Sequence, residues 1–285
     1  MPRWDTVALV GVGLIGGSIG LALRQRKLAR SVIGIGRRPA SLRRARERGA
    51  VTETTTNLSR GVSKSQLIVI CTPVEKIVSH CLETAQHCPP GTLITDVGST
   101  KAGIVARLEG ERRNLASRDV RFVGSHPLAG SEKMGPQHAR ADLFDHRAVV
   151  ITPSRSTCDS DYRTIEAFWK SLGALVYRKT PAAHDRAVAA ISHLPHVVAS
   201  ALAAGTPAAD LPLVAGGWLD TTRIAAANVE LWRQILVDNR DHVLKSLGKF
   251  EKVLTSFRQA LEKGDEECIL RLLKEGKDQR ESVGD

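Results

Sequence analysis

Short apolar runs alternate with stretches of helical periodicity through the first 180 positions of the chain. Short runs that are mostly apolar predict strands buried on both faces of a sheet, as in parallel sheets. We predict six such strands, over residues 6–10, 32–35, 67–71, 93–97, 122–124 and 148–152. Helical stretches such as 15–28 and 41–48 lie between most of them. This alternation predicts an α/β fold with helices on both faces of a parallel sheet.

The pattern changes after Lys179, and no convincing strand follows. Pro181 suits the first turn of a helix, and residues 187–202 are apolar on most sides, which predicts a buried helix. Near-heptad apolar spacing then predicts one long helix that buries a seam. Its positions are Val229, Trp232, Leu236, Val243, Leu247, Phe250, Leu254, Phe257 and Leu261. We therefore predict an α/β domain over residues 1–180 and an all-helical domain over residues 181–285, whose seam favours a homodimer over packing within the chain.

The composition of the chain indicates which class of ligand it binds. A formal net charge of +11 on 285 residues favours anionic ligands. Aromatic residues make up only 4% of the chain, which argues against stacking platforms for single-stranded nucleic acid. The basic residues are also spread along the sequence instead of forming one tail. We therefore expect a small anionic molecule as the partner and no nucleic acid.

The cysteines and an apolar segment near the N-terminus indicate where in the cell the protein is located. Five cysteines are an odd number and form no CxxC pair, which argues against a disulfide framework or a zinc site. Residues 6–23 carry no charge, but five glycines interrupt them and no A-x-A cleavage site follows. No other stretch is long and apolar enough to span a bilayer. We predict a soluble, cytoplasmic protein without a membrane partner.

The first predicted strand leads directly into a glycine motif. Gly11-Val12-Gly13-Leu14-Ile15-Gly16 has the pattern G-x-G-x-x-G and opens the first predicted helix. The first glycine permits a tight turn, the second lets the backbone approach a pyrophosphate, and the third lets helix and strand pack closely. Free N–H groups at the helix N-terminus then bind the phosphates. We predict a Rossmann-type domain in which Gly11, Gly13, Leu14, Ile15 and Gly16 bind a dinucleotide.

The end of the second predicted strand indicates which dinucleotide. NAD enzymes usually carry Asp or Glu there to bind the ribose 2′-hydroxyl. Here the position is Gly36, followed by Arg37 and Arg38. A guanidinium matches the geometry of a phosphate. We therefore predict NADP, bound partly by these two arginines, with NAD as the alternative.

Further polar residues follow the predicted strands, where the ligands of α/β proteins bind. Thr72 and Pro73 follow the third strand and are expected against the cofactor. Ser99 follows the fourth strand and His126 follows the fifth. A histidine on such a loop can act as a general base near neutral pH, although a histidine without this context is more often a surface residue.

The helical half adds two polar motifs. His193 and His196 are three residues apart and share a helix face; a metal is the minor interpretation, since no third ligand has matching spacing. Gly216 and Gly217 begin the second motif, which ends at Arg223. We expect Arg223 to be partly buried, because the residues after it carry no charge, and a buried arginine needs an anion. We expect these residues to line a cleft between the two halves and predict no metal site.

Together these motifs resemble the prephenate/arogenate dehydrogenase family over nearly the whole chain. The matching segments are GVGLIGGSIG, CTPV, DVGSTK, SHPLAGSEKMG, SHLPH and GGWLDTTRIA. The resemblance implies a Rossmann-type domain followed by an all-helical domain that dimerises. It also implies oxidative decarboxylation of prephenate, or of its amino analogue arogenate, with hydride transfer to NADP in tyrosine biosynthesis.

The resemblance also assigns roles to residues. His126 matches the catalytic histidine that bonds the ring 4-hydroxyl, and Ser99 matches a serine that contacts this histidine, the hydroxyl and the nicotinamide region. Arg223 matches the arginine that binds the ring carboxylate. Other matches are expected around the substrate: Ser131, Glu132, His193, His196, Gly216 and Gly217. The family often has three consecutive glycines where this chain has Ala215-Gly216-Gly217, from which we expect little effect.

Two alternatives come from other classes. A β-hydroxyacid dehydrogenase also joins a Rossmann half to helices, but its K-x-x-N motif is absent between Pro181 and Gly205. A non-catalytic NADP-sensing regulator would keep the glycine motif without needing His126, Ser99 and Arg223 together. The sequence leaves the choice between prephenate and arogenate open.

Overall fold

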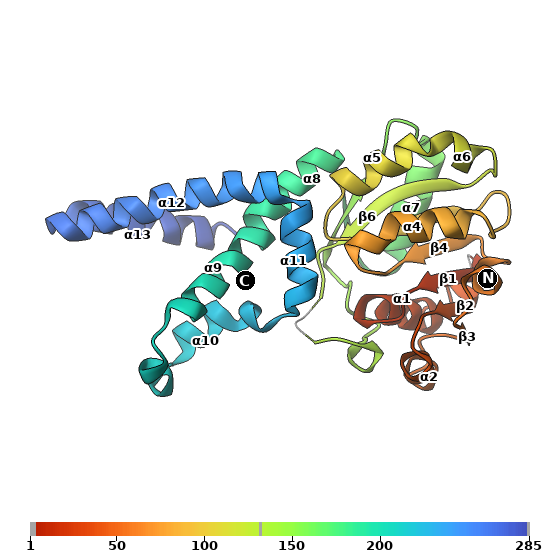
Figure 1. The fold of residues 1–285 in the computed structure, drawn as a ribbon, viewed down its shortest axis with the longest axis horizontal. Helices are drawn as coiled ribbons and strands as arrows, with labels where there is room; N and C mark the ends of the chain where they lie inside the picture. Colours follow the sequence, from red (N-terminus) through yellow and green to blue (C-terminus); the bar gives the residue numbers. More distant parts are fainter. Residues whose placement is uncertain (1–3, 131–132, 284–285) are drawn as a thin grey trace.

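The computed structural model describes residues 4–130 and 133–283, which form an α/β half and a helical half (Figure 1). The sheet has eight strands in the order β3-β2-β1-β4-β5-β6-β7-β8. Their bounds are β1 (Trp4–Val10), β2 (Ala29–Ile35), β3 (Glu53–Thr55), β4 (Leu67–Ile70), β5 (Leu93–Asp96), β6 (Arg121–Pro127), β7 (Ala148–Thr152) and β8 (Leu175–Arg178). All six strands predicted from the apolar runs are present.

Helices cover both faces of the sheet, as predicted. Successive residues of a strand point to opposite faces, so Val7 and Leu9 of β1 join one buried cluster while Ala8 and Val10 join the other. The helices of this half are α1 (Leu14–Gln25), α2 (Pro39–Glu47), α3 (Leu58–Val62), α4 (Val74–Ala85), α5 (Ala102–Gly110), α6 (Arg112–Ala116), the 3₁₀ turn η1 (Pro136–His138) and α7 (Asp159–Ser171).

The sheet departs from the prediction at its edges. β3 and β8 were not predicted, because β3 has only three residues, Glu53-Thr54-Thr55, and most of β8 is exposed. The predicted parallel sheet is present, but β7 is antiparallel to β6, so the sheet is mostly and not wholly parallel. A parallel pair needs a crossover from one end of the sheet to the other. Here β7 starts at the end of the sheet where β6 stops and runs back beside it.

The helical half contains no strand among its described residues. It consists of α8 (Pro181–Val188), the π-helical turn η2 (Ala189–His193), α9 (Leu194–Gly205), η3 (Ala208–Leu213), α10 (Gly216–Thr222), η4 (Arg223–Ala226), α11 (Val229–Asp238), α12 (Arg240–Lys263) and α13 (Glu266–Glu281). The Thr180 side chain caps α8 by accepting from Ala183 N, with Pro181 in the first turn as predicted. α9, α10, α12 and α13 extend away from the sheet, while α11 lies beside it (Figure 1).

Two predictions for this half were wrong. The seam is not one long helix, because Asn239 separates α11 from α12 and turns its side chain inward to donate to the Asp185 carbonyl. The helix over residues 187–202 is not fully buried, since Ile191 is 65% and Leu202 is 43% exposed. Residues 181–205 are long and apolar enough to cross a membrane by length and composition alone. However, His184 and Asp185 at the start of this helix are buried.

Candidate active site

A cleft of about 420 Å³ lies where the two halves meet. The strand order reverses between β1 and β4, and α/β proteins bind ligands beyond the carboxyl ends of strands at such a point. The segments that follow β1, β4, β5 and β6 line one side, and residues 227–234 of the helical half line the other. Among the predicted site residues it brings together Gly13, Leu14, Ile15, Gly16, Thr72, Pro73, Ser99 and His126.

The glycine motif has the geometry that a dinucleotide requires. Gly11 has a φ of +98°, and a Cβ there would lie 2.6 Å from the Cys71 carbonyl oxygen, so only glycine fits this turn. A Cβ on Gly13 would meet no protein atom within 4 Å and would instead occupy the cleft. α1 begins at Leu14, so its unpaired N–H groups lie at the cleft wall. The residues therefore fit a bound pyrophosphate.

The end of β2 matches the position predicted to select the dinucleotide. Gly36 directly follows the strand, and Arg37 and Arg38 are exposed. Neither arginine belongs to the cleft lining around His126, and Arg38 is the N-cap residue of α2.

His80, which was not predicted as a site residue, forms a hydrogen bond with Thr72 Oγ1 through Nδ1 at 3.0 Å. Burial lowers its pKa, and the nearby charges of Lys76 and Arg37 contribute, while Glu83 opposes them.

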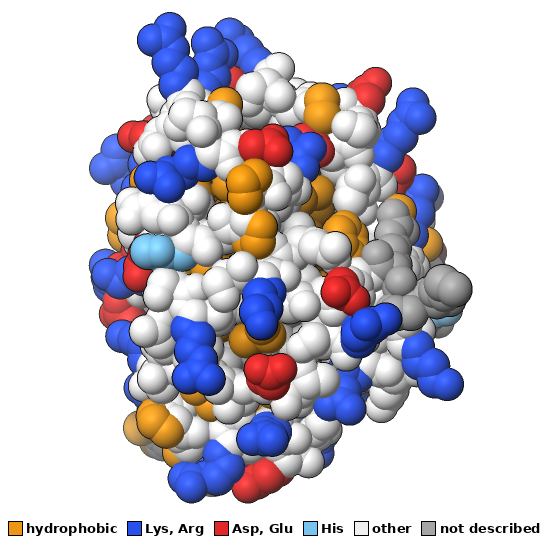
Figure 2. Space-filling model, turned by 90° about the vertical axis from the view of Figure 1, so that its right-hand side faces the viewer, with side chains coloured by type: hydrophobic (Ala, Val, Ile, Leu, Met, Phe, Trp, Pro, Cys, Tyr) orange, Lys and Arg blue, Asp and Glu red, His pale blue; other side chains and the backbone are white. Residues whose placement is uncertain are grey.

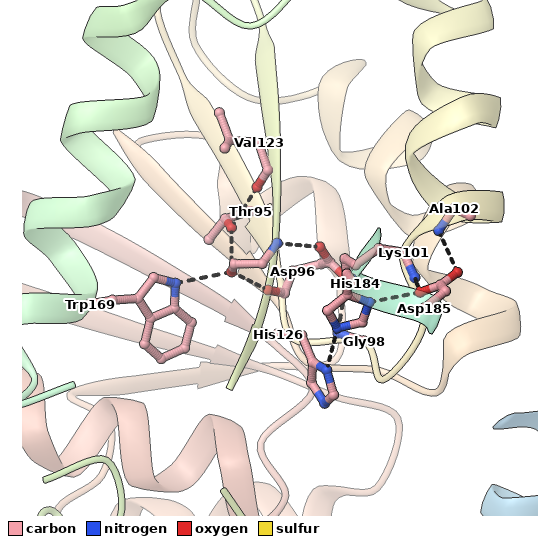
Figure 3. A network of polar contacts seen from close by, with 11 residues as sticks. Thr95, Asp96, Gly98, Lys101, Ala102, Val123, His126, Trp169, His184 and Asp185 are labelled. Carbon is pink, nitrogen blue, oxygen red and sulfur yellow. Dashed lines mark hydrogen bonds and ion pairs between the residues drawn. The ribbon is translucent and has the colours of Figure 1, made fainter. Parts of the chain in front are cut away.

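His126 lies at the end of β6 and is connected to the helical half. Its Nδ1 is 2.8 Å from His184 Nε2, and His184 Nδ1 is 2.7 Å from Asp185 Oδ1 (Figure 3). Burial lowers the pKa of His126 well below the ordinary value of 6.5, and the charges of His184, Lys101 and His193 act in the same direction. His126 is therefore a neutral base at physiological pH. His184 and Asp185 were not predicted from the sequence, because nothing local marks them as partners of His126.

A buried ion pair determines how Ser99 and His126 are placed. Lys101 and Asp96 pair with both side chains fully buried. Asp96 also accepts from Gly98 N at 2.9 Å and Ser125 N at 3.1 Å, the residues that precede Ser99 and His126 (Figure 3). One carboxylate thus fixes the loop before Ser99 relative to the end of β6 that carries His126.

His193 and His196 share a helix face as predicted, and both contact Trp232 of α11. The ring of His196 stacks on Trp232 with centroids 3.6 Å apart, and His193 meets the same ring edge-on at 6.0 Å. His193 Nδ1 is also 3.1 Å from Asn239 Nδ2. Burial lowers the pKa of His193 to about 4. Trp232 lines the cleft, so the histidines form a layer behind it.

The remaining predicted residues lie elsewhere. Gly216 and Gly217 begin α10 and are exposed. Arg223, expected to be partly buried, is exposed at the start of η4, and the apolar residues that follow it in this turn are at most half-buried. Ser131 and Glu132 lie outside the described residues. Within the described residues, no group of three His, Cys, Asp or Glu side chains could bind a metal ion.

Positive charge is widespread on the end of the α/β half that faces away from the helical half (Figure 2). Lys and Arg side chains are scattered over the end of the molecule formed by the α/β half and outnumber Asp and Glu there (Figure 2). They do not form a single patch in this view, in agreement with their spread along the sequence.

Comparison with known proteins gives consistent matches over both halves. The sequence profile of the prephenate dehydrogenase nucleotide-binding domain matches residues 19–178, and that of its dimerization domain matches residues 180–275. The prephenate dehydrogenase of Bacillus subtilis strain 168 is 34% identical over 286 aligned residues, which cover 98% of this chain and 76% of that protein.

Two solved structures share both the fold and the sequence pattern. Prephenate dehydrogenase from Aquifex aeolicus, in complex with hydroxyphenyl propionate and NAD⁺, has a TM-score of 0.89 and 30% identity over 98% of both chains. The arogenate dehydrogenase of Synechocystis has a TM-score of 0.79 and 31% identity, covering 98% of this chain and 99% of that one.

Proposed function

The chain belongs to the prephenate dehydrogenase family, and from this membership we propose that it oxidatively decarboxylates prephenate to 4-hydroxyphenylpyruvate with NADP, a step of tyrosine biosynthesis. The observation that carries the proposal is the cleft that places His126 and Ser99 beside the dinucleotide motif. The proposed boundary between the NADP-binding domain and the helical domain lies between residues 180 and 181.

In the proposed reaction the protein orients the substrate and supplies one base. Bound nicotinamide supplies the acceptor for the hydride that leaves ring C4. His126, neutral because burial lowers its pKa, accepts the proton of the 4-hydroxyl. Ser99 lines the cleft and orients that hydroxyl. The resulting ketone withdraws electrons from C1, carbon dioxide leaves, and aromatisation drives the step.

The proposed substrate contacts extend beyond the cleft wall. Arg223 binds the ring carboxylate, and Gly216, Gly217, His193 and His196 belong to the substrate-binding region, as do Ser131 and Glu132. Arogenate is the alternative substrate, since the Synechocystis relative is an arogenate dehydrogenase. A sensor without catalysis is the alternative from another class.

NADP is proposed because the structure offers no carboxylate at the end of β2. Gly36 stands where the ribose 2′-hydroxyl of NAD would be bound, and two exposed guanidiniums follow it. The Aquifex relative was crystallised with NAD⁺, so the arginines of this chain are the basis of the proposal, with NAD as the alternative.

A homodimer through the helical half is proposed from its exposed apolar side chains. Leu213 and Val229 are each 81% exposed, Leu261 is 67% and Ile191 is 65% exposed. Exposed apolar surface favours an interaction site on this half, and the matching profile describes a dimerization domain. A cytoplasmic location is proposed from the free cysteines.

Initial rates with prephenate and arogenate, each with NADP and NAD, test the proposal. Turnover on prephenate with NADP preferred supports substrate and cofactor together. Turnover with NAD preferred rejects the assignment of Gly36 and Arg37. Cofactor binding without turnover on either substrate would favour the non-catalytic sensor.

A further inference from the structure

A line of three side chains runs from the cleft into the interior and begins at His126. His126 comes from β6, whereas His184 and Asp185 come from α8 of the helical half (Figure 3). His184 is 0% and Asp185 2% exposed, so neither can contact substrate from the surface. The proposed function uses His126 and leaves both partners without a role.

Asp185 is fixed by backbone groups of the other half. Its Oδ1 accepts from Lys101 N at 2.7 Å and its Oδ2 accepts from Ala102 N at 2.8 Å, at the first turn of α5. Burial raises the pKa of this carboxyl, but the hydrogen bonds from His184, Ala102 and Lys101 outweigh it, so the net pKa is lowered. Asp185 is therefore an anion that can only accept hydrogen bonds.

This anion determines the proton positions on both rings. His184 must donate to Asp185 from Nδ1, so neutral His184 carries no proton on Nε2. His184 Nε2 is then an acceptor, and its partner at 2.8 Å, His126 Nδ1, must donate. Neutral His126 consequently keeps its lone pair on Nε2, the nitrogen that an attacking base requires.

We propose that His184 and Asp185 are positioning residues that set the tautomer of His126 and share its proton during the reaction. The inference rests on the proposed function. When the O–H bond of the 4-hydroxyl breaks, a new N–H bond forms at His126 Nε2. The Nδ1 proton of His126 passes to His184 Nε2, and the positive charge moves next to the Asp185 carboxylate. No further reactant is needed.

The surroundings of His126 explain why such a pair is useful. Burial disfavours a charge on His126, and the other groups that face it are the Lys101–Asp96 pair from the β5–α5 segment and His193 from η2. The charge of Lys101 opposes a second positive charge on His126. Transfer to His184 places the charge within hydrogen-bond distance of an anion, which a buried cation requires.

Two variants of His184 separate positioning from packing. His184→Phe keeps an aromatic ring of similar size but leaves His126 Nδ1 without its acceptor. His184→Gln can place an amide oxygen near the former Nε2, so it keeps the tautomer of His126 but cannot take the proton. We expect kcat to fall about 100-fold in the phenylalanine variant, the scale of general-base catalysis, and to recover about tenfold in the glutamine variant. KM for prephenate should stay within about threefold of the wild-type value in both.

The pH profile gives a second readout. An amide oxygen is a weaker base than imidazole, so His126 alone should take up its proton at lower pH than the histidine pair does. The acid limb of kcat should therefore move to lower pH in His184→Gln. An unchanged limb, or equal losses of kcat in the two variants, would indicate packing alone and overturn the proposal.

A measurement independent of turnover distinguishes failure of this inference from failure of the proposed function. Nitrogen-15 NMR of histidine-labelled protein with NADP bound reports which ring nitrogen of His126 carries the proton. We expect the Nδ1–H tautomer in the wild type and in His184→Gln, and a mixture in His184→Phe. A wild-type Nε2–H tautomer would overturn the inference even if prephenate is turned over. The expected tautomers would support it even if prephenate is not the substrate.

Discussion

Replacing Lys101 by methionine should destabilise the α/β half strongly, because it leaves a buried charge without its counterion. Lys101 and Asp96 are both 0% exposed. Breaking such a pair costs about 3–5 kcal/mol. Asp96 would keep its bonds from Gly98 N and Ser125 N, which remain after the substitution. We therefore expect the lower end of the range, about 3 kcal/mol.

The assay is urea unfolding followed by tryptophan fluorescence. Trp169 is fully buried in the α/β core and donates to Ser125 Oγ at 3.0 Å, so it reports on the region around Asp96. With a slope of about 3 kcal/mol per molar urea, a loss of about 3 kcal/mol moves the midpoint by about 1 M. Two controls calibrate this shift. Lys170→Met removes a partner from the exposed Lys170–Glu166 pair and should cost less than about 1 kcal/mol.

The second control is the double variant Asp96→Asn/Lys101→Met, which removes both charges. It should recover a large part of the lost stability, because no uncompensated charge remains. A single variant as stable as Lys170→Met would refute the reasoning. So would a double variant less stable than Lys101→Met alone, since the loss would then come from packing and not from the unpaired carboxylate.

Other predictions concern the reaction itself. Arg37→Asp should raise the KM for NADP at least about tenfold and that for NAD much less, since a charged hydrogen bond contributes about 1.5–3 kcal/mol; equal changes in initial-rate measurements would count against NADP. His126→Asn should lower kcat by about 10²–10⁴-fold while NADPH binding, followed by fluorescence, stays unchanged; wild-type turnover in this variant would remove His126 as the base. Because burial lowers the pKa of His126 well below 6.5, kcat should stay level as pH falls through 6.5 and decline only below it; a decline centred at or above 6.5 would contradict a neutral buried base. Arg223→Ala should raise the KM for prephenate about tenfold or more with a smaller change in kcat, on the scale of a lost charged hydrogen bond; an unchanged KM would remove its assigned role.

The local sequence pattern predicted the helices and strands more accurately than the way in which they connect. The buried strands could be predicted because each is a short, mostly apolar run, and the turn at Gly11 could be predicted because its chemistry is local. The direction of β7 was not visible, because residues 128–147 carry no periodic signal that distinguishes a crossover from a return along the same edge. The break at Asn239 was missed for a similar reason, since its inward hydrogen bond goes to Asp185, 54 positions away.

In the candidate site, too, the sequence pattern could not predict contacts between residues that are far apart in the chain. The residues at strand ends, such as Ser99 and His126, could be placed together because parallel strands end at one edge. His184 could not, because its partner is 58 positions away and in the other half. Asp185 joins the halves by binding the first turn of α5. The base is therefore assembled only when both halves have packed, and no segment of sequence contains it.

Arg223 and the exposed helix faces share one explanation. Their sequence surroundings are apolar and predicted burial, yet Arg223, Ile191 and Val229 are exposed in the single chain. An apolar pattern indicates that a surface will be covered, but it does not specify by which chain. In a symmetric dimer each copy covers the same face of the other, so the proposed homodimer is expected to cover these apolar faces. The part of the site predicted around Arg223 would then be completed by assembly, whereas the base at His126 is completed within one chain.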